Sequence, residues 1–285
     1  MPWRAIERRT VRPAGRNYTC RVMRYAAYPP SPFLAGVVDC FWLLEGAGTG
    51  VPEPIIPDGR VEIVVHYGAR FERHHPGGRV ERQPASLLVG QMLAPISIGH
   101  HGHAGVAAIR LRPAAARAIV RCSAAEITGR VVDLEDLFGS TATLRERLAL
   151  APGDEARVRL LEAWLRAIVR GAPAREIDLA VGAIAASAGT IDLIAVASDT
   201  GLSLRQLERR FLADVGLAPK VFARTVRLQA ALRRIAEGDA LADVALACGY
   251  YDQPHMARDF RRLAETSPAA WQQYGGALTP LFIGR

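Results

Sequence analysis

The chain of 285 residues has few cysteines, a single lysine and no long apolar segment. Its four cysteines (Cys20, Cys40, Cys122 and Cys248) are scattered without a Cys-x-x-Cys spacing, so neither a disulfide framework nor a zinc site is expected. No apolar run approaches the roughly 20 residues that span a bilayer, and the arginine-rich start lacks the apolar core of a secretory signal. These absences predict a cytoplasmic protein with no membrane partner.

The sequence also lacks the short motifs of common enzyme classes, namely a phosphate-binding loop, a dinucleotide fingerprint and a Ser-His-Asp set. Histidines do gather at His100, His101 and His103, with His74 and His75 earlier in the chain, and His101–His103 is spaced as in metal-binding cupins. No glutamate follows within the next turn or strand, and glycines flank the pair, so we expect an ordinary loop. The sequence therefore predicts no metal, no cofactor and no enzyme activity.

The chain does contain ample apolar residues and an excess of positive charge. Half of its residues are hydrophobic, which is enough for packed cores, and the length suits about two domains. The formal net charge of +8 fits a polyanionic partner. Residues 203–234 hold eight basic and two acidic side chains, a local net charge of +6. Arginine is favoured throughout this sequence, so the total net charge is weak evidence for a polyanionic partner. The local cluster at residues 203–234 is stronger evidence.

Residues 23–112 have the pattern of a β-rich domain. Short β-branched and aromatic runs alternate with glycine and proline, and Pro57-Asp58-Gly59 is a strong turn signal. Strands of this spacing predict a small barrel or sandwich. Residues 1–22 are basic and without periodicity, so we expect either a disordered arm or an over-extended start with Met23 as the true initiator.

After Arg112 the periodicity becomes helical. Residues 113–172 are expected to form a helical extension, in which Ser123 and Glu126 make a capping box. Gly171-Ala172-Pro173 breaks the helix and marks the best domain boundary. The remainder up to a loose tail at 276–285 is predicted to be seven helices. They are expected at 180–186, 193–197, 203–214, 219–237, 242–248, 252–263 and 268–274. The fold class is thus α+β with two main parts.

Two segments of the helical half, Asp192–Phe211 and Leu241–Phe260, have the same pattern. Three pairs of identical residues lie 49 positions apart, namely Arg209 and Arg258, Phe211 and Phe260, and Pro219 and Pro268. Each segment is typical of a short helix, a tight turn and a second helix that can enter the major groove of DNA. Two such units about one turn of B-DNA apart, roughly 34 Å, would read successive groove segments. The repeat predicts double-stranded DNA as the partner.

The outward residues of each second helix suit base recognition. In the first unit Ser203 is the expected N-cap, and Arg205, Glu208 and Arg209 follow on the outer face. Arginine can donate two hydrogen bonds to guanine, and glutamate can accept one from the cytosine amino group. In the second unit Asp252 is the expected N-cap. The outward residues there are Gln253, Pro254, Ala257 and Arg258.

These segments together resemble the AraC family of bacterial transcription regulators over residues 176–275. The resemblance lies in LSLRQLERRF, the Gly216–Pro219 return, VFARTVRLQAAL, LADVALACGYYDQPHMARDFRR and Ser267-Pro268. It implies two helix-turn-helix units joined by a linker helix from Pro219 to Ile235. It also implies base reading by Arg205, Glu208, Arg209, Gln253, Pro254 and Arg258, and backbone contacts by Ser203, Arg210 and Arg261. One departure is Glu265 where the first unit has Gly216, and a left-handed turn there would cost on the order of 1 kcal/mol.

The front half resembles, less specifically, an uncharacterised β-rich regulatory domain that precedes this DNA-binding domain in such regulators. The segments concerned are Phe41–Gly46 and Ile56–Glu62. Glu62, His66 and Arg110 are expected at the mouth of the β domain with Trp42 as an apolar wall, where a small-molecule effector would bind. The alternative is that Trp42 belongs to the core and the charged groups are solvated edges.

The sequence as a whole predicts a sequence-specific DNA-binding transcription regulator that is modulated by its front domain. A homodimer and RNA polymerase are expected further partners. The alternative is a cupin-like enzyme that binds a metal or small molecule and carries a DNA-binding appendage. A third interpretation is a protein–protein module that uses the helical segment 140–170.

Overall fold

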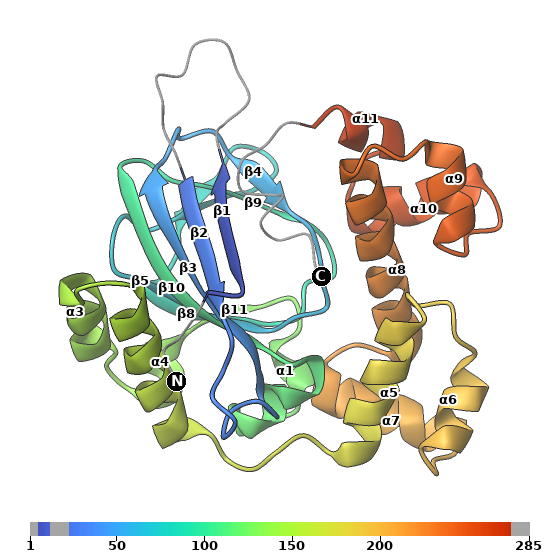
Figure 1. Cartoon of the computed structure of the whole chain (residues 1–285), viewed down its shortest axis with the longest axis horizontal. Coiled ribbons are helices and arrows are strands. Elements are labelled where there is room, and N and C mark those ends of the chain that lie inside the picture. The colour runs from blue at the N-terminus through green and yellow to red at the C-terminus, as the bar shows by residue number, and fades with distance from the viewer. Residues whose placement is uncertain (1–4, 12–22, 275–285) are drawn as a thin grey trace.

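The computed structural model describes residues 5–11 and 23–274 and divides into a sheet-containing amino-terminal part, which ends at residue 168, and a helical part that begins at residue 175 (Figure 1). Seven strands of the described residues form one antiparallel sheet in the order β1-β2-β3-β10-β5-β8-β11. Their bounds are β1 Glu7–Val11, β2 Met23–Tyr28, β3 Val38–Ala47, β5 Glu62–His66, β8 Ser86–Val89, β10 His103–Leu111 and β11 Val131–Asp133. A second sheet has the order β4-β9-β6-β7. Its bounds are β4 Glu53–Ile55, β6 Glu72–His74, β7 Val80–Arg82 and β9 Ile96–Gly99.

The predicted β-rich domain is confirmed, but of the barrel or sandwich that the sequence predicted, the barrel is wrong because both sheets are open over the described residues. The reason is that β1 and β11 lie at opposite edges of the larger sheet, where they pair with β2 and β8 and not with each other. β11 also corrects the prediction that residues 113–172 are all helical, because residues 131–133 return to the sheet.

Strand β1 lies within the segment predicted to be a disordered arm. Residues 7–11 pair with β2 in a register that places Glu7 opposite Ala27 and Val11 opposite Met23. Such pairing uses main-chain groups, so an arginine-rich strand can add to a sheet edge without an apolar pattern of its own. The other residues of the predicted arm, 1–4 and 12–22, and the predicted tail at 276–285 lie outside the described residues.

The continuous apolar run of β3 is explained by burial on both faces of the sheet. Trp42 and Leu44 point into the layer between the two sheets, together with Phe71 and Ile98. The intervening side chains point the other way and pack under helices. These helices are η1 (a 3₁₀ helix, Pro113–Ala118), α1 Ala124–Ile127, α2 Leu134–Phe138, α3 Ala142–Leu150 and α4 Asp154–Ile168.

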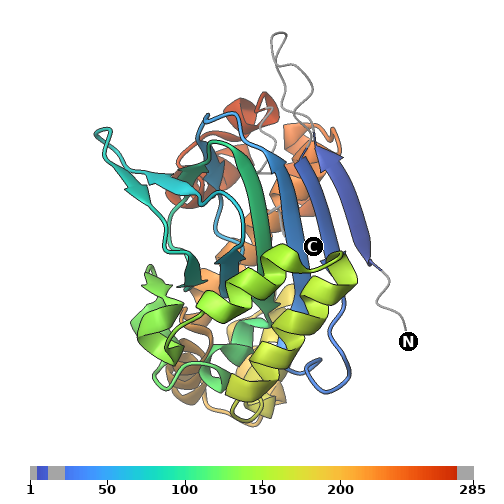
Figure 2. The same ribbon diagram turned by 90° about the vertical axis from the view of Figure 1, so that its left-hand side faces the viewer.

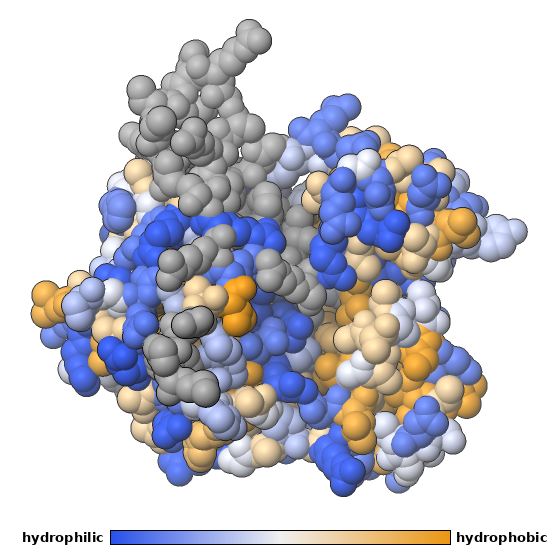
Figure 3. Space-filling view, in the orientation of Figure 1, coloured by the Kyte–Doolittle hydropathy of each residue, from blue (hydrophilic) through white to orange (hydrophobic). Residues whose placement is uncertain are grey.

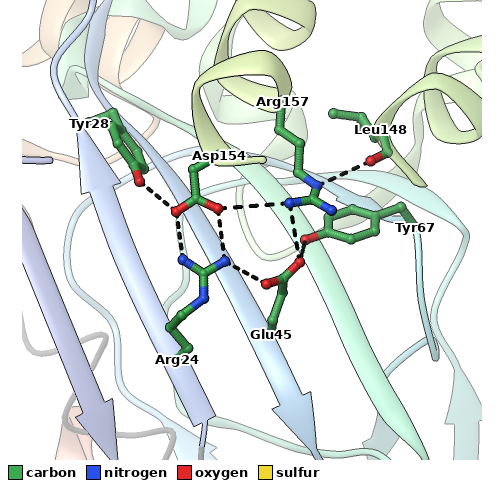
Figure 4. A network of polar contacts seen from close by, with 7 residues as sticks. All are labelled: Arg24, Tyr28, Glu45, Tyr67, Leu148, Asp154 and Arg157. Atoms are coloured by element: carbon green, nitrogen blue, oxygen red, sulfur yellow. Dashed lines mark hydrogen bonds and ion pairs between the residues drawn. The ribbon is translucent and has the colours of Figure 1, made fainter. Parts of the chain in front are cut away.

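Helix α4 crosses the face of the large sheet (Figure 2) and is held there by a network of charged side chains (Figure 4). The Arg24 guanidinium from β2 donates to the Asp154 carboxylate of α4 at 2.5 and 2.8 Å and also bonds Glu45 of β3. Tyr67 donates to Glu45 at 2.7 Å, and Arg157 lies 3.3 Å from the same carboxylate. The hydrogen bond from Arg24 holds the pKa of Asp154 below its usual value.

Seven helices follow within the described part of the chain, as the sequence predicted. They are α5 Arg175–Ala186, α6 Leu193–Asp199, α7 Leu204–Val215, α8 Pro219–Ala236, α9 Leu241–Ala247, α10 Gln253–Leu263 and α11 Pro268–Gln272. We call α6 with α7 the first unit and α9 with α10 the second unit. Each unit has its own apolar core, and α8 contributes side chains to both. None of the helices described has the length and apolar character needed to cross a membrane.

Candidate DNA-binding surface

Helix α7 is bounded by a capping residue at each end. Ser203 caps its start as predicted, since its hydroxyl accepts a hydrogen bond from the Gln206 amide and the Gln206 side chain accepts one from the Ser203 amide. Gly216 ends the helix with φ +87°, a left-handed conformation that glycine adopts without steric cost. Leu207 and Phe211 are buried in the core of the first unit. This burial fixes which side of α7 faces outward.

The predicted base-reading residues of α7 lie on that outward side. Arg205, Glu208 and Arg209 are exposed. Arg210 is only half-exposed and makes an ion pair with Glu176 of α5 at 3.4 Å. A phosphate contact by Arg210 would therefore require this pair to be exchanged, and its assignment to the DNA backbone stays a prediction.

Helix α10 repeats this arrangement in the second unit. The Asp252 carboxylate caps it as predicted by accepting a hydrogen bond from the His255 amide at 2.6 Å. Met256 and Phe260 are buried, as Leu207 and Phe211 are in α7. The predicted DNA-contacting side chains Gln253, Pro254, Arg258 and Arg261 are all exposed.

Four arginines of the two helices are free to contact DNA. Among the described residues no ion pair or hydrogen bond engages the guanidinium groups of Arg205, Arg209, Arg258 and Arg261. An exposed guanidinium without an internal partner can pair with a phosphate or a guanine edge at no loss of an existing bond. The two helices thus present unpaired positive charge on their outer faces.

The two units match closely but not at one fixed spacing. Equivalent residues of α7 and α10 lie 49 residues apart in the sequence. In the helices that precede them, Val196 and Ala197 of α6 correspond to Val244 and Ala245 of α9, which lie only 48 residues on. The turn after each first helix is closed by the same pair of main-chain bonds. The extra residue falls immediately before the cap of α10, at Tyr251, which is 93% exposed. Gly201 and Gly249 follow the shorter spacing, which places the insertion between these glycines and the caps of α7 and α10.

Glu265, which stands where the first unit has Gly216, has the backbone conformation that the repeat predicted. Its φ is +51°, in the left-handed region that Gly216 occupies 49 residues earlier. The left-handed turn at this position is confirmed, and its cost stays a prediction.

The amino-terminal part is joined to the first unit and to α8 by specific contacts. Arg117 of η1 pairs with Asp214 of α7 at 2.8 Å, and the Thr128 hydroxyl donates to the Gly216 carbonyl at 2.7 Å. On α8, the Gln229 side-chain amide donates to the Pro57 carbonyl at 2.7 Å. We call these contacts the seam. They cover the carboxyl end of α7 and leave its amino-terminal half exposed.

The candidate ligand residues of the front domain lie in two places. The Glu62 carboxylate accepts hydrogen bonds from the Trp42 indole at 3.1 Å and from Arg110 at 2.7 Å. Trp42 is in the core, as the alternative interpretation held, but Arg110 is 8% exposed and so is not a solvated edge. His66 is also buried and contacts Phe71 rather than this cluster. A ligand-binding role for the four residues stays a prediction.

Sequence reasoning missed Asp58, which it treated only as part of a turn. The carboxylate is buried 3.6 Å from the Arg110 guanidinium, and burial raises the pKa of Asp58 to about 6 although Arg110 opposes this. Asp58 lies between two residues that approach α8, because the Pro57 carbonyl accepts a hydrogen bond from Gln229 and Gly59 lies against Phe222. Three consecutive residues thus link the buried cluster to the linker helix.

The loop histidines do not form a metal centre in the part of the chain that the structure describes. His101 and His103 are exposed, and His75 pairs with Glu81. No group of three or more histidine, cysteine or acidic side chains comes together there in an arrangement that could hold a metal ion.

Two buried imidazoles predict acid sensitivity. Burial lowers the pKa of His66 and of His100 to about 4, whereas an unfolded histidine titrates near 6.5. Between pH 6.5 and 4 the unfolded state binds protons that the folded state does not, so stability is expected to fall as pH drops through this window. Asp58 opposes this trend, because its raised pKa adds stability as pH falls below 6.

Denaturant unfolding at a series of pH values would isolate the histidine contribution. His66→Gln should reduce the loss of stability between pH 6.5 and 4, whatever its effect at pH 7. His255→Gln, at a partly exposed histidine of the helical part, serves as the control for the loss of an imidazole outside the buried pair. Parallel pH profiles for His66→Gln and the unaltered chain would contradict the assignment.

Comparison with known proteins agrees with this geometry. Residues 196–274 match a family described as a helix-turn-helix domain, and residues 26–133 match a domain of unknown function, DUF6597. The regulator MtrA of Neisseria gonorrhoeae, named an HTH-type transcriptional regulator, is 37% identical over 76 residues, which are 26% of this chain and 25% of MtrA. The HTH-type transcriptional activator RhaS of Klebsiella pneumoniae is 36% identical over 74 residues, 26% of this chain and 27% of RhaS. The chain therefore matches about a quarter of the length of these relatives.

Solved structures with similar features include ToxT from Vibrio cholerae, with 8% identity, a TM-score of 0.49 and coverage of 82% of this chain and 98% of ToxT. A probable AraC family transcriptional regulator from Rhodopseudomonas palustris has 28% identity and a TM-score of 0.33, with coverage of 35% of this chain and 96% of that one. The sequence relatives, the matched family and the duplicated units agree on the carboxyl-terminal region. Residues 196–274 of this chain form a helix-turn-helix domain, which is similar in sequence to part of the transcription regulators MtrA and RhaS.

Proposed function

We propose that this protein is a cytoplasmic transcription regulator that reads two successive major-groove segments of double-stranded DNA. Arg205, Glu208 and Arg209 would contact bases from α7, and Gln253, Pro254 and Arg258 would do so from α10. Ser203, Arg210 and Arg261 would hold the backbone. The observation that carries the proposal is the pair of capped helices whose exposed arginines have no internal partner. The curated relatives are transcription regulators, which favours this function over a cupin-like enzyme.

The amino-terminal part would regulate DNA binding through the seam. Its proposed domains are a β-rich regulatory domain at 23–112 and an extension at 113–172, ahead of the DNA-binding domain at 176–275. A small-molecule effector that reaches the cluster of Trp42, Glu62 and Arg110 would disturb Asp58 and, through Pro57, the linker helix. His66 would belong to the same regulatory domain.

Contacts with other proteins would use the apolar surface of the helical part. Figure 3 shows apolar residues gathered over the lower part of this region, where α5 and α6 lie in Figure 1. Leu179 of α5 and Ile194 of α6 are 53% and 65% exposed. Exposed apolar patches of this kind suit protein partners. A second copy of the chain and RNA polymerase are the partners we propose.

Selection of binding sites from a random duplex library, with the full chain at near-physiological salt, tests the function. The expected result is one enriched motif with two half-sites about one helical turn apart. A motif with a single half-site would contradict reading by both units. No enrichment, with and without added cell metabolites as a source of effector, would contradict sequence-specific binding.

A further inference from the structure

The linker helix α8 carries a row of cations that the base-reading proposal does not use. Lys220, Arg224 and Arg227 are spaced at i, i+4 and i+7, which places them along one side of the helix. All three border a hollow of about 430 Å³ between the start of α6 and the start of α10. Asp192, His255 and Asp259 also line it.

The charges around this hollow leave a positive excess. Arg224 pairs with Asp259 at 3.4 Å, and this acid is the only one in the hollow that contacts a cation of the row. Arg227 donates to the Gly189 carbonyl at 2.6 Å, which orients the guanidinium but does not neutralise it. Lys220 is exposed, and within the described residues no hydrogen bond or ion pair engages its ammonium group. Three cations therefore face two carboxylates, and one of those, Asp192, is occupied in capping α6.

The position of the hollow identifies what would fill it. The first unit lies at one end of α8 and the second unit at the other (Figure 1). Helices that enter two successive major-groove segments on one face of B-DNA have a minor groove between them. The two phosphate backbones that border this minor groove are the parts of the duplex nearest to the protein there. Their charge is opposite to that of the row on α8.

We propose that the row of Lys220, Arg224 and Arg227 binds the sugar–phosphate backbone between the two major-groove segments. This inference rests on the proposed DNA-binding function and extends it to the linker helix. Lys220 makes the direct phosphate contact, because its ammonium group is free. Arg224 and Arg227, which are held by Asp259 and Gly189, add positive potential. Such contacts carry no base preference but position the protein on the duplex.

The single lysine allows a direct test on the unaltered chain. A lysine-selective acylating reagent can modify only Lys220 and the chain's α-amino group, and mass spectrometry distinguishes the two sites. Saturating duplex DNA that contains the selected motif should slow acylation of Lys220 by severalfold relative to the α-amino group. Equal rates with and without bound DNA would overturn the proposal.

The salt dependence of binding supplies an independent readout. For Lys220→Gln the slope of log K against log salt should become shallower by about 0.9, the value of one phosphate contact on B-DNA. The affinity should fall by a similar factor for selected and unrelated duplexes. The matched control is Arg147→Gln, at an exposed arginine of α3 on the amino-terminal part, and its slope should equal that of the unaltered chain. An unchanged slope for Lys220→Gln overturns this inference alone, whereas failure of the unaltered chain to bind any duplex overturns the proposed function as well.

Discussion

Arg209→Ala and Arg258→Ala are each expected to weaken binding to the selected duplex by about 1–3 kcal/mol, which corresponds to roughly 5- to 150-fold. Both side chains are exposed on the outer faces of α7 and α10 and have no ion-pair partner among the described residues, so alanine removes the proposed DNA contact without breaking an internal one. Each variant should also tolerate base changes in its own half-site, because the lost guanidinium no longer distinguishes guanine. Binding titrations at fixed salt against duplexes with single base-pair changes would measure both effects.

The double variant and a control sharpen this test. Arg209 and Arg258 belong to different units with separate cores, so their free-energy changes should add when both are replaced. Arg147→Ala, also at an exposed helical arginine, should bind as the unaltered chain does. An equal loss on every duplex, with base preference intact, would show that the two arginines contact phosphates rather than bases.

Gly216→Ala is expected to destabilise the protein by about 2–3 kcal/mol, because it combines a left-handed residue with a steric clash. A Cβ atom at this position would lie 2.6 Å from the Thr128 hydroxyl oxygen and 2.9 Å from the Ala124 carbonyl oxygen. The second of these is main chain and cannot move aside without shifting α1. The substitution therefore strains both the end of α7 and the seam with the amino-terminal part. Denaturant unfolding followed by circular dichroism would measure the change.

Gly201→Ala is the matched control for that experiment. Gly201 also has a left-handed backbone, with φ +70°, but a Cβ atom there would meet open space. This variant should lose only about 1 kcal/mol from backbone strain. The difference between the two variants measures the contribution of the seam. Equal losses would show that the seam adds nothing to stability.

Features that depend on neighbouring residues were predictable from the sequence. The caps at Ser203, Asp252 and Ser123 form as expected, since each involves residues two or three positions away. The left-handed turn at Glu265 followed from the repeat itself. The outward faces of α7 and α10 were predictable for the same reason, because the buried residues recur at helical spacing.

Features that join distant parts of the chain were not predictable. Asp58 lies close to Arg110 although the two are 52 residues apart in the sequence, and Gln229 donates a hydrogen bond to Pro57, which is 172 residues away in the sequence. No local pattern encodes such pairs, and a buried arginine has the same sequence signature as an exposed one. The pairing of β1 with β2 was hidden in the same way, since main-chain bonds leave no mark on composition. The burial of Arg110 and His66 was therefore not predictable, whereas the exposure of the outer faces of α7 and α10 was.

Helix α8 also has a mechanical consequence for the operators that the proposed two-unit binding would accept. Its 18 residues form a rod about 27 Å long that enters the cores of both units, so the distance between them is built in covalently. One inserted base pair moves one half-site about 3.4 Å along the duplex and rotates it by roughly 35° around the axis. A flexible tether would absorb that shift, but a rod packed at both ends would have to bend or release one half-site. Functional operators should therefore keep one fixed phase between their two halves.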